Sequence, residues 1–483
     1  MNALIEKANL SKSFEKKLKL WLEPVEGGSP ELFLVGGAVR DKQLGRAPGD
    51  MDLVCRDAEG FARRLAAAHE AVVVPFEKKI SEPCYRVVEK KDPSNHLDIT
   101  PIKGGSLMSD LGKRDFTVNA MAIPIVQGRL LKELLDPFKG AEDIKRRLIR
   151  MTAPEAFVDD PLRILRAFRF SAELGFNIES TTLNIMKKEA QKLETSAAER
   201  VFSEIMRIFN SPLSTPLTHL MDDTGVLEVI LPEIQAMKGC AQNSFHHKDV
   251  WGHSLLVLEN CEYMLSHLET SFSDVASVVK DNLAQGNRLP VLKLSALLHD
   301  VGKPQTRGIN DQTGRITFYG HDEQGAEIIS AMGRKLKMPN SDRRLLSRLV
   351  REHLHVLNLS NPELKKTTRL KWFRKLRDDA VPAILLGMAD IKGTLGPDSN
   401  EKQITEQLQW SREAIKDYYG HIKKELERQS LLTGKDLLEL GMPAGPEMGK
   451  ILKAVREAQD TGLVANRKEA LKLAKEMIGS LSE

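Results

Sequence analysis

Two aspartates one residue apart, Asp50 and Asp52, carry the side chains best suited to chemistry in this sequence. Alternate side chains of a strand share a face, so both carboxylates point the same way while Met51 points into the core. Two neighbouring carboxylates repel one another unless a cation lies between them. The pair therefore predicts a site where Mg²⁺ ions face phosphates, although an Asp-x-Asp in a surface turn is more often only solvated.

A glycine pair before these aspartates favours the metal site over the solvated turn. Residues 32–35 read as a short buried strand, and Gly36 and Gly37 follow it directly. Because glycine has no Cβ, the backbone at this point can approach a triphosphate closely, and Arg40 adds positive charge nearby. This arrangement is typical of a nucleotide-binding site.

Two later segments supply groups that suit the same site. A predicted strand brings a third carboxylate, Asp98, to the pair, or carries it as a structural residue. A polar loop at residues 110–120 leads into an apolar strand, and its Arg114, Asp115 and Asn119 are suited to hold a triphosphate and a ribose. The alternative for this loop is a solvated turn capped by Asp115.

A helix start at residues 159–163 has the sequence Asp-Asp-Pro-Leu-Arg. Taken alone, it predicts a capping acid and a proline in the first turn. Asp160 and Arg163 are three residues apart, which predicts an ion pair on the helix surface.

A second group of candidate residues lies on otherwise apolar predicted helices. It consists of His253, His299, Asp300 and Asp390. Imidazole and carboxylate groups from separate helices that aim at one point form a site for a divalent transition metal or Mg²⁺. A lone histidine on an apolar face is more often a core residue, but the adjacent His-Asp pair followed by Gly302 and Lys303 favours a metal site.

The composition bounds the class of protein. A chain of 483 residues is too long for one core and predicts three or four domains. Its net charge of +4 is compatible with a polyanionic partner.

The cysteines and the lack of long apolar runs indicate the compartment. The four cysteines form no Cys-x-x-Cys pair, so we expect a protein of the reducing cytoplasm. No stretch reaches the roughly 20 apolar residues of a membrane span, so we expect no contact with a membrane. No leader segment is recognisable, and nothing in the sequence indicates an oligomeric state.

The hydrophobic pattern predicts an α+β fold. Residues 1–25 read as an amphipathic helix with Leu18 and Trp21 on one side. Strand-like runs follow at residues 32–35, 51–54, 71–75, 85–88, 97–100 and 120–125. From about residue 155 onward the apolar residues recur at helical spacing almost throughout.

The order of these motifs resembles that of the class II tRNA nucleotidyltransferases, which comprise the CCA-adding enzymes and their poly(A) polymerase relatives in the DNA polymerase β superfamily. The resemblance covers roughly the first half of the chain. It rests on Gly-Gly-Ala-Val-Arg-Asp at 36–41, the Asp-x-Asp, Arg-Asp-Phe-Thr-Val-Asn-Ala at 114–120, Asp-Pro-Phe-Lys-Gly at 136–140 and the helix start at 159–163. Lys113 stands where the family has a first arginine, a change that keeps the charge and loses bidentate geometry.

The resemblance implies specific roles for the motif residues. Asp160 would accept, and Arg163 donate, hydrogen bonds at the Watson–Crick edge of the incoming base, so that a base is selected without a nucleic-acid template. Arg166 and Arg169, which follow on the same helix, would also bind nucleotide. Asp50 and Asp52 would hold Mg²⁺.

The histidine-rich second half resembles the HD phosphohydrolase superfamily, whose ligands follow the order His, His-Asp, Asp. His321 and His353 match additional histidines of that superfamily, which implies a possible second metal ion. Residues 432–462, with their repeated glycines, resemble the helical tail of bacterial CCA-adding enzymes that also carry an HD domain. This tail favours tRNA as the substrate.

These resemblances imply a domain order as well. We expect an N-terminal helix at 1–25, a polymerase β-like nucleotidyltransferase head with a mixed sheet and helices at 26–154, and an all-α neck at 155–245. An HD metal-dependent phosphohydrolase domain at 246–395 and a helical tRNA-binding tail at 396–483 would complete the chain.

The leading hypothesis is a Mg²⁺-dependent enzyme that adds C and A residues to the tRNA 3′ end from CTP and ATP, with a second, metal-dependent phosphohydrolase site. Alternatives are an A-adding or CC-adding nucleotidyltransferase, a poly(A) polymerase, or an HD phosphohydrolase whose front half only binds RNA. A non-catalytic RNA-binding protein is disfavoured because neither cluster of candidate residues has lost a member.

Overall fold

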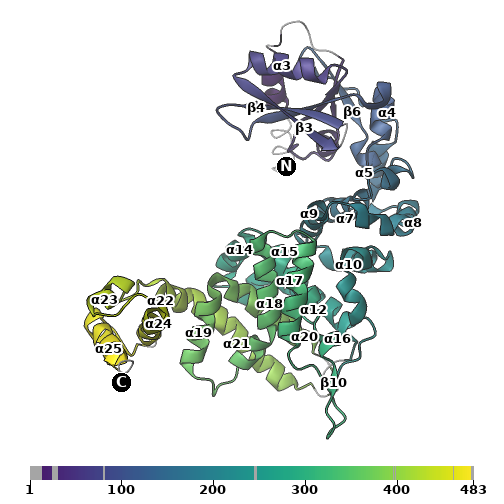
Figure 1. The fold of residues 1–483 in the computed structure, drawn as a ribbon. Coiled ribbons are helices and arrows are strands. Elements are labelled where there is room, and N and C mark those ends of the chain that lie inside the picture. The colour runs from purple at the N-terminus through teal and green to yellow at the C-terminus, as the bar shows by residue number, and fades with distance from the viewer. Residues whose placement is uncertain are drawn as a thin grey trace. The chain divides into compact units, whose positions relative to one another are not determined.

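A computed structural model describes residues 14–23, 25, 31–79, 82–243, 247–394, 396–397, 399–460 and 462–479. The chain divides into two compact units, Met1–Ile230 and Leu231–Glu483. The first unit carries a sheet and helices, and the second is almost entirely helical (Figure 1). The predicted α+β fold is therefore confirmed.

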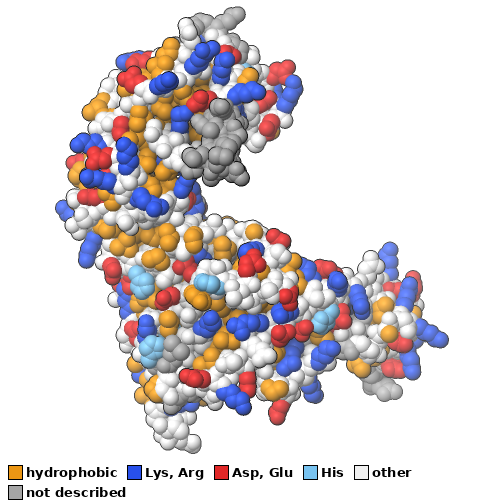
Figure 2. Space-filling model, turned by 180° about the vertical axis from the view of Figure 1, so that it is seen from behind, with side chains coloured by type: hydrophobic (Ala, Val, Ile, Leu, Met, Phe, Trp, Pro, Cys, Tyr) orange, Lys and Arg blue, Asp and Glu red, His pale blue; other side chains and the backbone are white. Residues whose placement is uncertain are grey.

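The surface mixes charges of both signs. Lys and Arg side chains alternate with Asp and Glu over the face presented in Figure 2. Among the described residues, no helix combines the length and the apolar character needed to cross a membrane.

A seven-stranded sheet forms the centre of the first unit. Its strands lie in the order β3-β4-β5-β2-β1-β6-β7, and only the β2/β5 pair is parallel. The strands are β1 (Leu32–Val35), β2 (Asp52–Cys55), β3 (Ala71–Lys79), β4 (Glu82–Glu89), β5 (His96–Pro101), β6 (Ala122–Val126) and β7 (Arg129–Leu130). Each of the six predicted runs overlaps one of these strands.

Helices flank and follow this sheet. Those of the sheet region are α2 (Gly37–Gln43), α3 (Ala58–Ala68), α4 (Leu107–Gly112) and α5 (Gly140–Arg146). Then come α6 (Ala156–Asp159), α7 (Arg163–Leu174), α8 (Ser180–Glu189), α9 (Ala198–Phe209), α10 (Ser214–Asp223) and α11 (Val226–Ile230), with a small parallel pair of β8 (Leu148–Ile149) and β9 (Asn177–Ile178). The predicted change to helical periodicity near residue 155 is confirmed.

The second unit is built around one apolar helix. Helix α20 (Ala380–Gly393) buries nearly every residue, because its sequence is apolar on all sides, and it packs against α12, α15, α18 and α21. The helices of this region are α12 (Val250–Ser266), α13 (Leu268–Phe272), α14 (Ala276–Ala284), α15 (Arg288–Leu298), α16 (Lys303–Thr306), α17 (His321–Lys335), α18 (Asn340–Leu359), α19 (Lys366–Leu376), α21 (Glu401–Asp417) and α22 (Lys423–Glu427). A two-stranded ribbon, β10 (Gly308–Ile309) and β11 (Ile316–Thr317), precedes α17.

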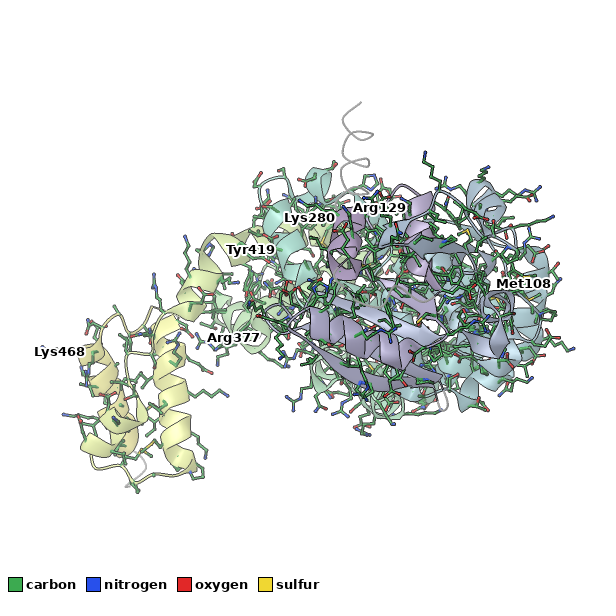
Figure 3. The ribbon with its side chains drawn as sticks, turned by 90° about the horizontal axis from the view of Figure 1, so that it is seen from above. Met108, Arg129, Lys280, Arg377, Tyr419 and Lys468 are labelled. Atoms are coloured by element: carbon green, nitrogen blue, oxygen red, sulfur yellow. The ribbon has the colours of Figure 1, made fainter. Side chains whose placement is uncertain are left out.

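The last helices have a core of their own. Leu437, Ile451, Val455 and Ala470 are among the residues buried between α23 (Gly434–Glu439), α24 (Pro446–Asp460) and α25 (Arg467–Gly479). Figure 3 shows these helices together, with Lys468 on the outer side of α25.

Candidate functional site

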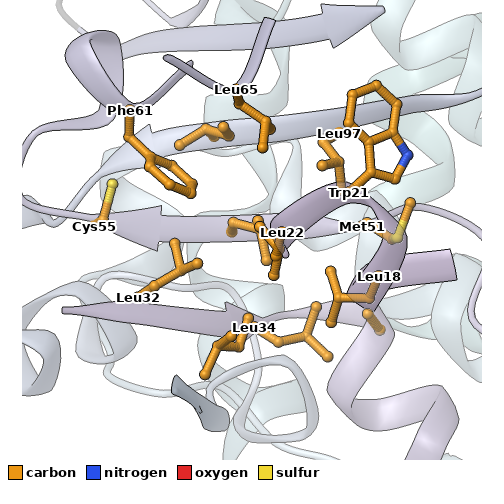
Figure 4. Packing of buried hydrophobic residues seen from close by; sticks show 14 of the residues in the cluster. Leu18, Trp21, Leu22, Leu32, Leu34, Met51, Cys55, Phe61, Leu65 and Leu97 are labelled. Atoms are coloured by element: carbon orange, nitrogen blue, oxygen red, sulfur yellow. The ribbon is translucent and has the colours of Figure 1, made fainter. Parts of the chain in front are cut away.

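A buried core fixes the strands that carry the first site. All four residues of β1 are buried, with Leu32 and Leu34 in the large core on one side of the sheet and Phe33 and Val35 in a smaller core on the other. Residues 14–22 form the described part of the predicted N-terminal helix, and Leu18, Trp21 and Leu22 pack on the large core (Figure 4). The end of β1 is thus held from both faces.

Gly36 makes the turn from β1 into α2. Its φ of +71° is a conformation that side-chain-bearing residues rarely adopt. A Cβ on Gly36 would also lie 3.0 Å from Nη1 of Arg114 and 3.9 Å from Oδ2 of Asp52. The first glycine of the pair therefore lets the backbone approach two of the predicted site residues.

The two aspartates lie where the second core strand begins. Strand β2 starts at Asp52, and Met51 and Leu53 beside it are buried, which matches the predicted alternation. Asp50 precedes the strand, and its side chain is 78% exposed. Both carboxylates therefore point away from the core, as a metal-binding pair requires.

Asp98 lies beside Asp52 on the neighbouring strand. The two residues are register partners of the parallel strands β2 and β5, so their side chains share a face of the sheet. The carboxylate of Asp98 is held by Arg86, whose Nε and Nη2 donate to it at 2.7 and 2.9 Å. The structure thus places a third carboxylate next to the pair and gives it an arginine partner.

One cavity of about 520 Å³ collects most of the predicted residues of this site. Asp98 is not among the residues that line it. The predicted residues in its wall are Gly36, Gly37, Arg40, Asp50, Asp52, Arg114, Asp115, Asn119, Asp160, Arg163, Arg166 and Arg169. The sequence analysis missed Lys103, Arg200 and Arg207, which also line it. Arg200 and Arg207 are seven residues apart on α9, so both lie on one face of that helix. This spacing is visible in the sequence and could have identified them.

Hydrogen bonds link the predicted nucleotide-binding residues to one another. Arg40 donates through Nη1 to Oδ1 of Asn119 at 2.8 Å, and Asn119 donates through Nδ2 to Oδ1 of Asp115 at 3.0 Å. Arg166 donates through Nε to the other oxygen of Asp115 at 2.9 Å. Burial by itself would raise the pKa of Asp115, but the charge of Arg166 and the bond from Asn119 outweigh it and hold this pKa well below its usual range. Asp115 therefore acts as a fixed anion that orients the cations around it.

Arg163 is oriented by backbone carbonyls. Its Nη2 donates to the carbonyl of Lys113 at 2.6 Å, and its Nη1 donates to that of Ala156 at 3.3 Å. Leu162 is the N-cap of α7, and no side chain caps that helix, so the predicted capping acid is not found there. The guanidinium is therefore fixed in the wall of the cavity.

Asp160 and Arg169 are held by charged partners. Nη2 of Arg200 lies 3.5 Å from Oδ2 of Asp160. Arg169 is buried, donates to Glu204 at 2.6 Å and to Glu173 at 2.9 Å, and lies over the ring of Phe170. Burial lowers the pKa of Arg169, and the two carboxylates stabilise its charge. Helices α7 and α9 are thus tied together directly behind Asp160.

The histidines and aspartates of the second unit form two adjoining clusters. His253, His299 and Asp390 offer ligand atoms that lie within 4.8 Å of one another, and so do Asp300, His321 and His353. All six residues are buried. The sequence analysis instead grouped Asp300 with His253, His299 and Asp390. It assigned His321 and His353 to a possible second metal ion.

Asp300 connects the two clusters. One carboxylate oxygen, Oδ2, lies 3.1 Å from Nε2 of His299, and the other, Oδ1, lies 3.4 Å from Nε2 of His321. Lys303 also contacts Oδ2, at 2.6 Å. A carboxylate placed between two groups of ligands is suited to bridge two metal ions.

Backbone carbonyls set the tautomers of three of these histidines. Nδ1 of His299, His321 and His353 lies 3.0, 2.7 and 2.6 Å from the carbonyls of Ala296, Phe318 and Val350. Each Nδ1 is therefore the donor, and each Nε2 faces the cluster, where it offers a lone pair whenever its ring is neutral. Nε2 of His321 and Nε2 of His353 face one another at 3.3 Å, an arrangement that a cation between them would stabilise.

The pKa values of two of these histidines are shifted in opposite directions. Burial disfavours the charge on His299, but Asp300 and Asp390 raise its pKa to about 10. Burial and the neighbouring histidines lower the pKa of His353 to about 4. The two carboxylates thus attract positive charge to this buried set, and a divalent cation in place of the proton on His299 would satisfy the same carboxylates.

Gly302 permits the close contact between the elements of this site. A Cβ on Gly302 would lie 2.2 Å from the carbonyl oxygen of His321 and 2.6 Å from the amide nitrogen of Gly325. The start of α17 can thus approach the His-Asp pair only because residue 302 has no side chain.

Four family models match the chain. They are the poly A polymerase head domain at residues 32–150, the probable RNA and SrmB-binding site of polymerase A at 175–238, the HD domain at 250–391 and domain 2 of tRNA nucleotidyltransferase at 345–474. Their order agrees with the motif order in the sequence.

Curated relatives are similar over nearly their whole length. An A-adding tRNA nucleotidyltransferase of Deinococcus radiodurans is 32% identical, over 92% of this chain and 95% of the relative. A CC-adding tRNA nucleotidyltransferase of Thermus thermophilus is 33% identical, over 91% and 92%. A multifunctional CCA protein of Xanthomonas campestris is 31% identical, over 89% and 97%.

Solved structures share the fold. A CCA-adding enzyme in an apo form matches with a TM-score of 0.62 and 22% identity, covering 98% of this chain and 96% of that one. The CCA-adding enzyme of Thermotoga maritima, complexed with tRNA, matches with a TM-score of 0.60 and 20% identity, covering 96% and 94%.

Proposed function

The chain belongs to the family of tRNA nucleotidyltransferases that contains the CCA-adding enzymes, and we propose that it adds C and A residues to the tRNA 3′ end from CTP and ATP. The observation that carries this proposal is the single cavity that joins the aspartate pair to Arg114, Asp160 and Arg163.

Within this cavity the residues have separate tasks. Asp50 and Asp52, with Asp98 beside them, would hold Mg²⁺, which activates the 3′-hydroxyl and neutralises the charge of the leaving pyrophosphate. Gly36 and Gly37 leave room for the triphosphate at the end of β1. The buried Nε of Arg114 has no hydrogen-bond acceptor among the residues that the structure describes, which supports a ligand at this point.

The other arginines and Asn119 position the nucleotide. Arg40, Asn119 and Asp115 form a chain of hydrogen bonds that ends at Arg166, so the donors aimed at phosphate and ribose share one anchor. Arg169 keeps Phe170 and the carboxylate of Glu204 on α9 in place.

Asp160 and Arg163 select the base. An acceptor and a fixed fork of donors match the edge of C or of A, whereas a wrong base leaves buried polar groups unpaired. Arg200, whose Nη2 lies 3.5 Å from Oδ2 of Asp160, orients that carboxylate.

The decisive assay uses labelled CTP and ATP with three tRNAs that lack the last three, the last two or the last nucleotide. Incorporation of C and A into the shortest tRNA, abolished by EDTA, is the expected result. A chain that extends only the shortest two with C, or only the longest with A, would instead have the partial activity that the names of the Thermus and Deinococcus relatives describe. No incorporation into any tRNA would contradict the proposal.

For the second unit we propose a metal-dependent phosphohydrolase that acts on 2′,3′-cyclic phosphates or other phosphoesters. Two adjoining donor sets bridged by Asp300 support it. His253, His299 and Asp390 would hold one divalent ion, and Asp300, His321 and His353 a second, and these ions would activate the attacking water. Opening of a cyclic nucleotide with added Ni²⁺, Mn²⁺ or Mg²⁺ tests this function, and absence of product with all three metals would contradict it.

We also propose the domain order head (26–154), neck (155–245), HD domain (246–395) and tRNA-binding tail (396–483) after the N-terminal helix. The four matched family segments follow that order. Four cysteines without a disulfide support the reducing cytoplasm as the location.

A further inference from the structure

A basic hollow of about 380 Å³ lies on the second unit, apart from the six buried metal-site candidates. Its lining residues come from helices α17, α18 and α19, which Figure 1 labels. We name it the α18 hollow; its charged lining residues are Arg343, Arg344, Arg348, Arg351, Glu352 and Lys375.

Carboxylates neutralise only part of this positive charge. Arg348 pairs with Asp379, Arg351 with Glu323 at 2.7 Å, and Lys375 with the buried Glu352.

The two remaining arginines have no acidic partner. Arg343 donates to the neutral amide oxygen of Asn340 at 2.8 Å. Arg344 is exposed and has no hydrogen bond or ion pair with any residue that the structure describes. Two positive charges of the α18 hollow are therefore left for a ligand.

Three of the arginines form a row. Arg344, Arg348 and Arg351 are spaced i, i+4, i+7 on α18, so they share one face and span about 10 Å at 1.5 Å per residue. Like charges at this spacing destabilise a helix slightly, so the row is not there to stabilise α18. Each strand of a nucleic-acid duplex carries one phosphate per about 3.4 Å of helix axis, so the row is long enough to lie along about three of them.

The lining favours a backbone over a free nucleotide. No aromatic side chain lines the α18 hollow, so a base would have nothing to stack on. The neighbouring Trp372 is buried and donates its indole N–H to Glu352 at 3.0 Å. The hydroxyl group of Ser330, like the arginines, suits phosphate oxygens, whereas that of Ser347 already donates to the carbonyl of Ala326 at 3.0 Å.

We propose that the α18 hollow docks the sugar-phosphate backbone of an RNA strand without reading its sequence. That the RNA is the tRNA substrate rests on the proposed function; the site itself rests on the arginine row.

Salt-dependent binding of tRNA to the full chain tests this site. Arg344→Ala removes the unpaired cation, and Lys335→Ala, an exposed lysine of α17 outside the lining, is the matched control. With Kd measured between about 50 and 200 mM KCl, Arg344→Ala should weaken binding several-fold at low salt and lower the slope of log Kd against log salt by about 0.7 to 0.9. Arg344→Glu should weaken binding further, and the control should match the unaltered protein.

Three outcomes decide the matter. Equal slopes for Arg344→Ala, Arg344→Glu and the unaltered chain, or an equal change in the control, would overturn the site. Absence of tRNA binding by the unaltered chain would overturn both this site and the proposed function. Dependence of binding on Arg344 without any nucleotide incorporation would leave the site standing and overturn only the proposed function. Because Arg344 is exposed and makes no hydrogen bond or ion pair with a described residue, both variants should keep the melting temperature of the unaltered chain.

Discussion

The two candidate sites of this chain hold their charged groups in opposite ways. In the first unit, the aspartate pair is at the edge of a wide cavity, and one of its side chains is 78% exposed. In the second unit, all six histidines and aspartates are buried, and Nδ1 atoms of three histidines are tied to backbone carbonyls. An exposed cavity suits a site that must admit a nucleotide and an RNA end together. A buried set of ligand atoms suits metal ions that remain bound.

The difference extends to how each site uses arginine. The cavity of the first unit contains a set of arginines whose donors are fixed by carbonyls and carboxylates, a preorganised surface for phosphates. The buried cluster contains no arginine among its six members and relies on imidazole and carboxylate. The arginines of the first unit are thus suited to phosphate groups, whereas the buried cluster of the second unit is suited to metal ions.

The largest loss of activity should follow from replacing Asp52, the residue that begins β2. Asp52→Asn removes a predicted metal ligand without changing core volume, so nucleotide addition should fall at least about 100-fold, or about 2.7 kcal/mol. Asp50→Asn should act in the same way. The tRNA affinity and the melting temperature should stay close to those of the unaltered chain.

Glu70→Gln, the same chemical change at an exposed surface pair, is the control and should leave the rate unchanged. An aspartate variant that kept more than about a tenth of the rate would contradict a metal role of several kcal/mol.

A comparable loss should follow in the other site. His299→Gln removes a donor that lies between Asp300 and Asp390, so opening of the cyclic nucleotide should fall about 100-fold with any added metal. Metal binding, measured by calorimetry with Ni²⁺, should weaken in parallel.

His267→Gln is the matched control, because His267 is exposed and its ring hydrogen-bonds locally, to Ser266 and Tyr263. Unchanged metal affinity in a folded His299→Gln protein would remove His299 from the donor set.

A smaller, more selective effect is expected at Arg163. Arg163→Ala should relax discrimination among CTP, ATP, UTP and GTP by roughly tenfold, since one lost hydrogen bond to a base edge costs about 1–3 kcal/mol. Arg163→Lys keeps the charge but loses the planar fork, so it should also relax selectivity. Kinetics with the four triphosphates on one truncated tRNA give the ratios, and unchanged ratios would leave Arg163 a purely structural role.

The smallest expected effect is a difference in stability between alanine variants of Gly36 and Gly37. Gly36→Ala should destabilise the first unit by about 1–3 kcal/mol, because φ is +71° and the new Cβ would press on Arg114. Gly37→Ala, at the first position of α2 with 3.6 Å to its nearest neighbour, should be neutral or slightly stabilising. Thermal unfolding of both variants measures the difference, and equal melting temperatures would contradict the role of Gly36.

Local pattern predicted the elements of the first unit well. The apolar run at 32–35 coincides with β1, and the alternation around Asp52 places Met51 and Leu53 in the core as expected. These features depend on short-range periodicity, which a single sequence contains.

Contacts between distant segments could not be predicted in the same way. Arg86 as partner of Asp98, the carbonyls around Arg163 and the arginines of α9 depend on how strands and helices pack, and no local spacing encodes that packing. The bridging position of Asp300 likewise follows from the approach of α17 at Gly302. Motif order identified the residues of the metal cluster, but only the fold divides them into two donor sets.

The most direct test of two independent sites measures both activities in the same preparation of each variant protein. Asp52→Asn and His299→Gln are each measured for CTP incorporation into a truncated tRNA and for opening of a 2′,3′-cyclic nucleotide. Each variant should lose about 100-fold in one activity and stay within about twofold of the unaltered chain in the other. Loss of both activities in either variant, with the protein still folded, would contradict the division of chemistry between the two units.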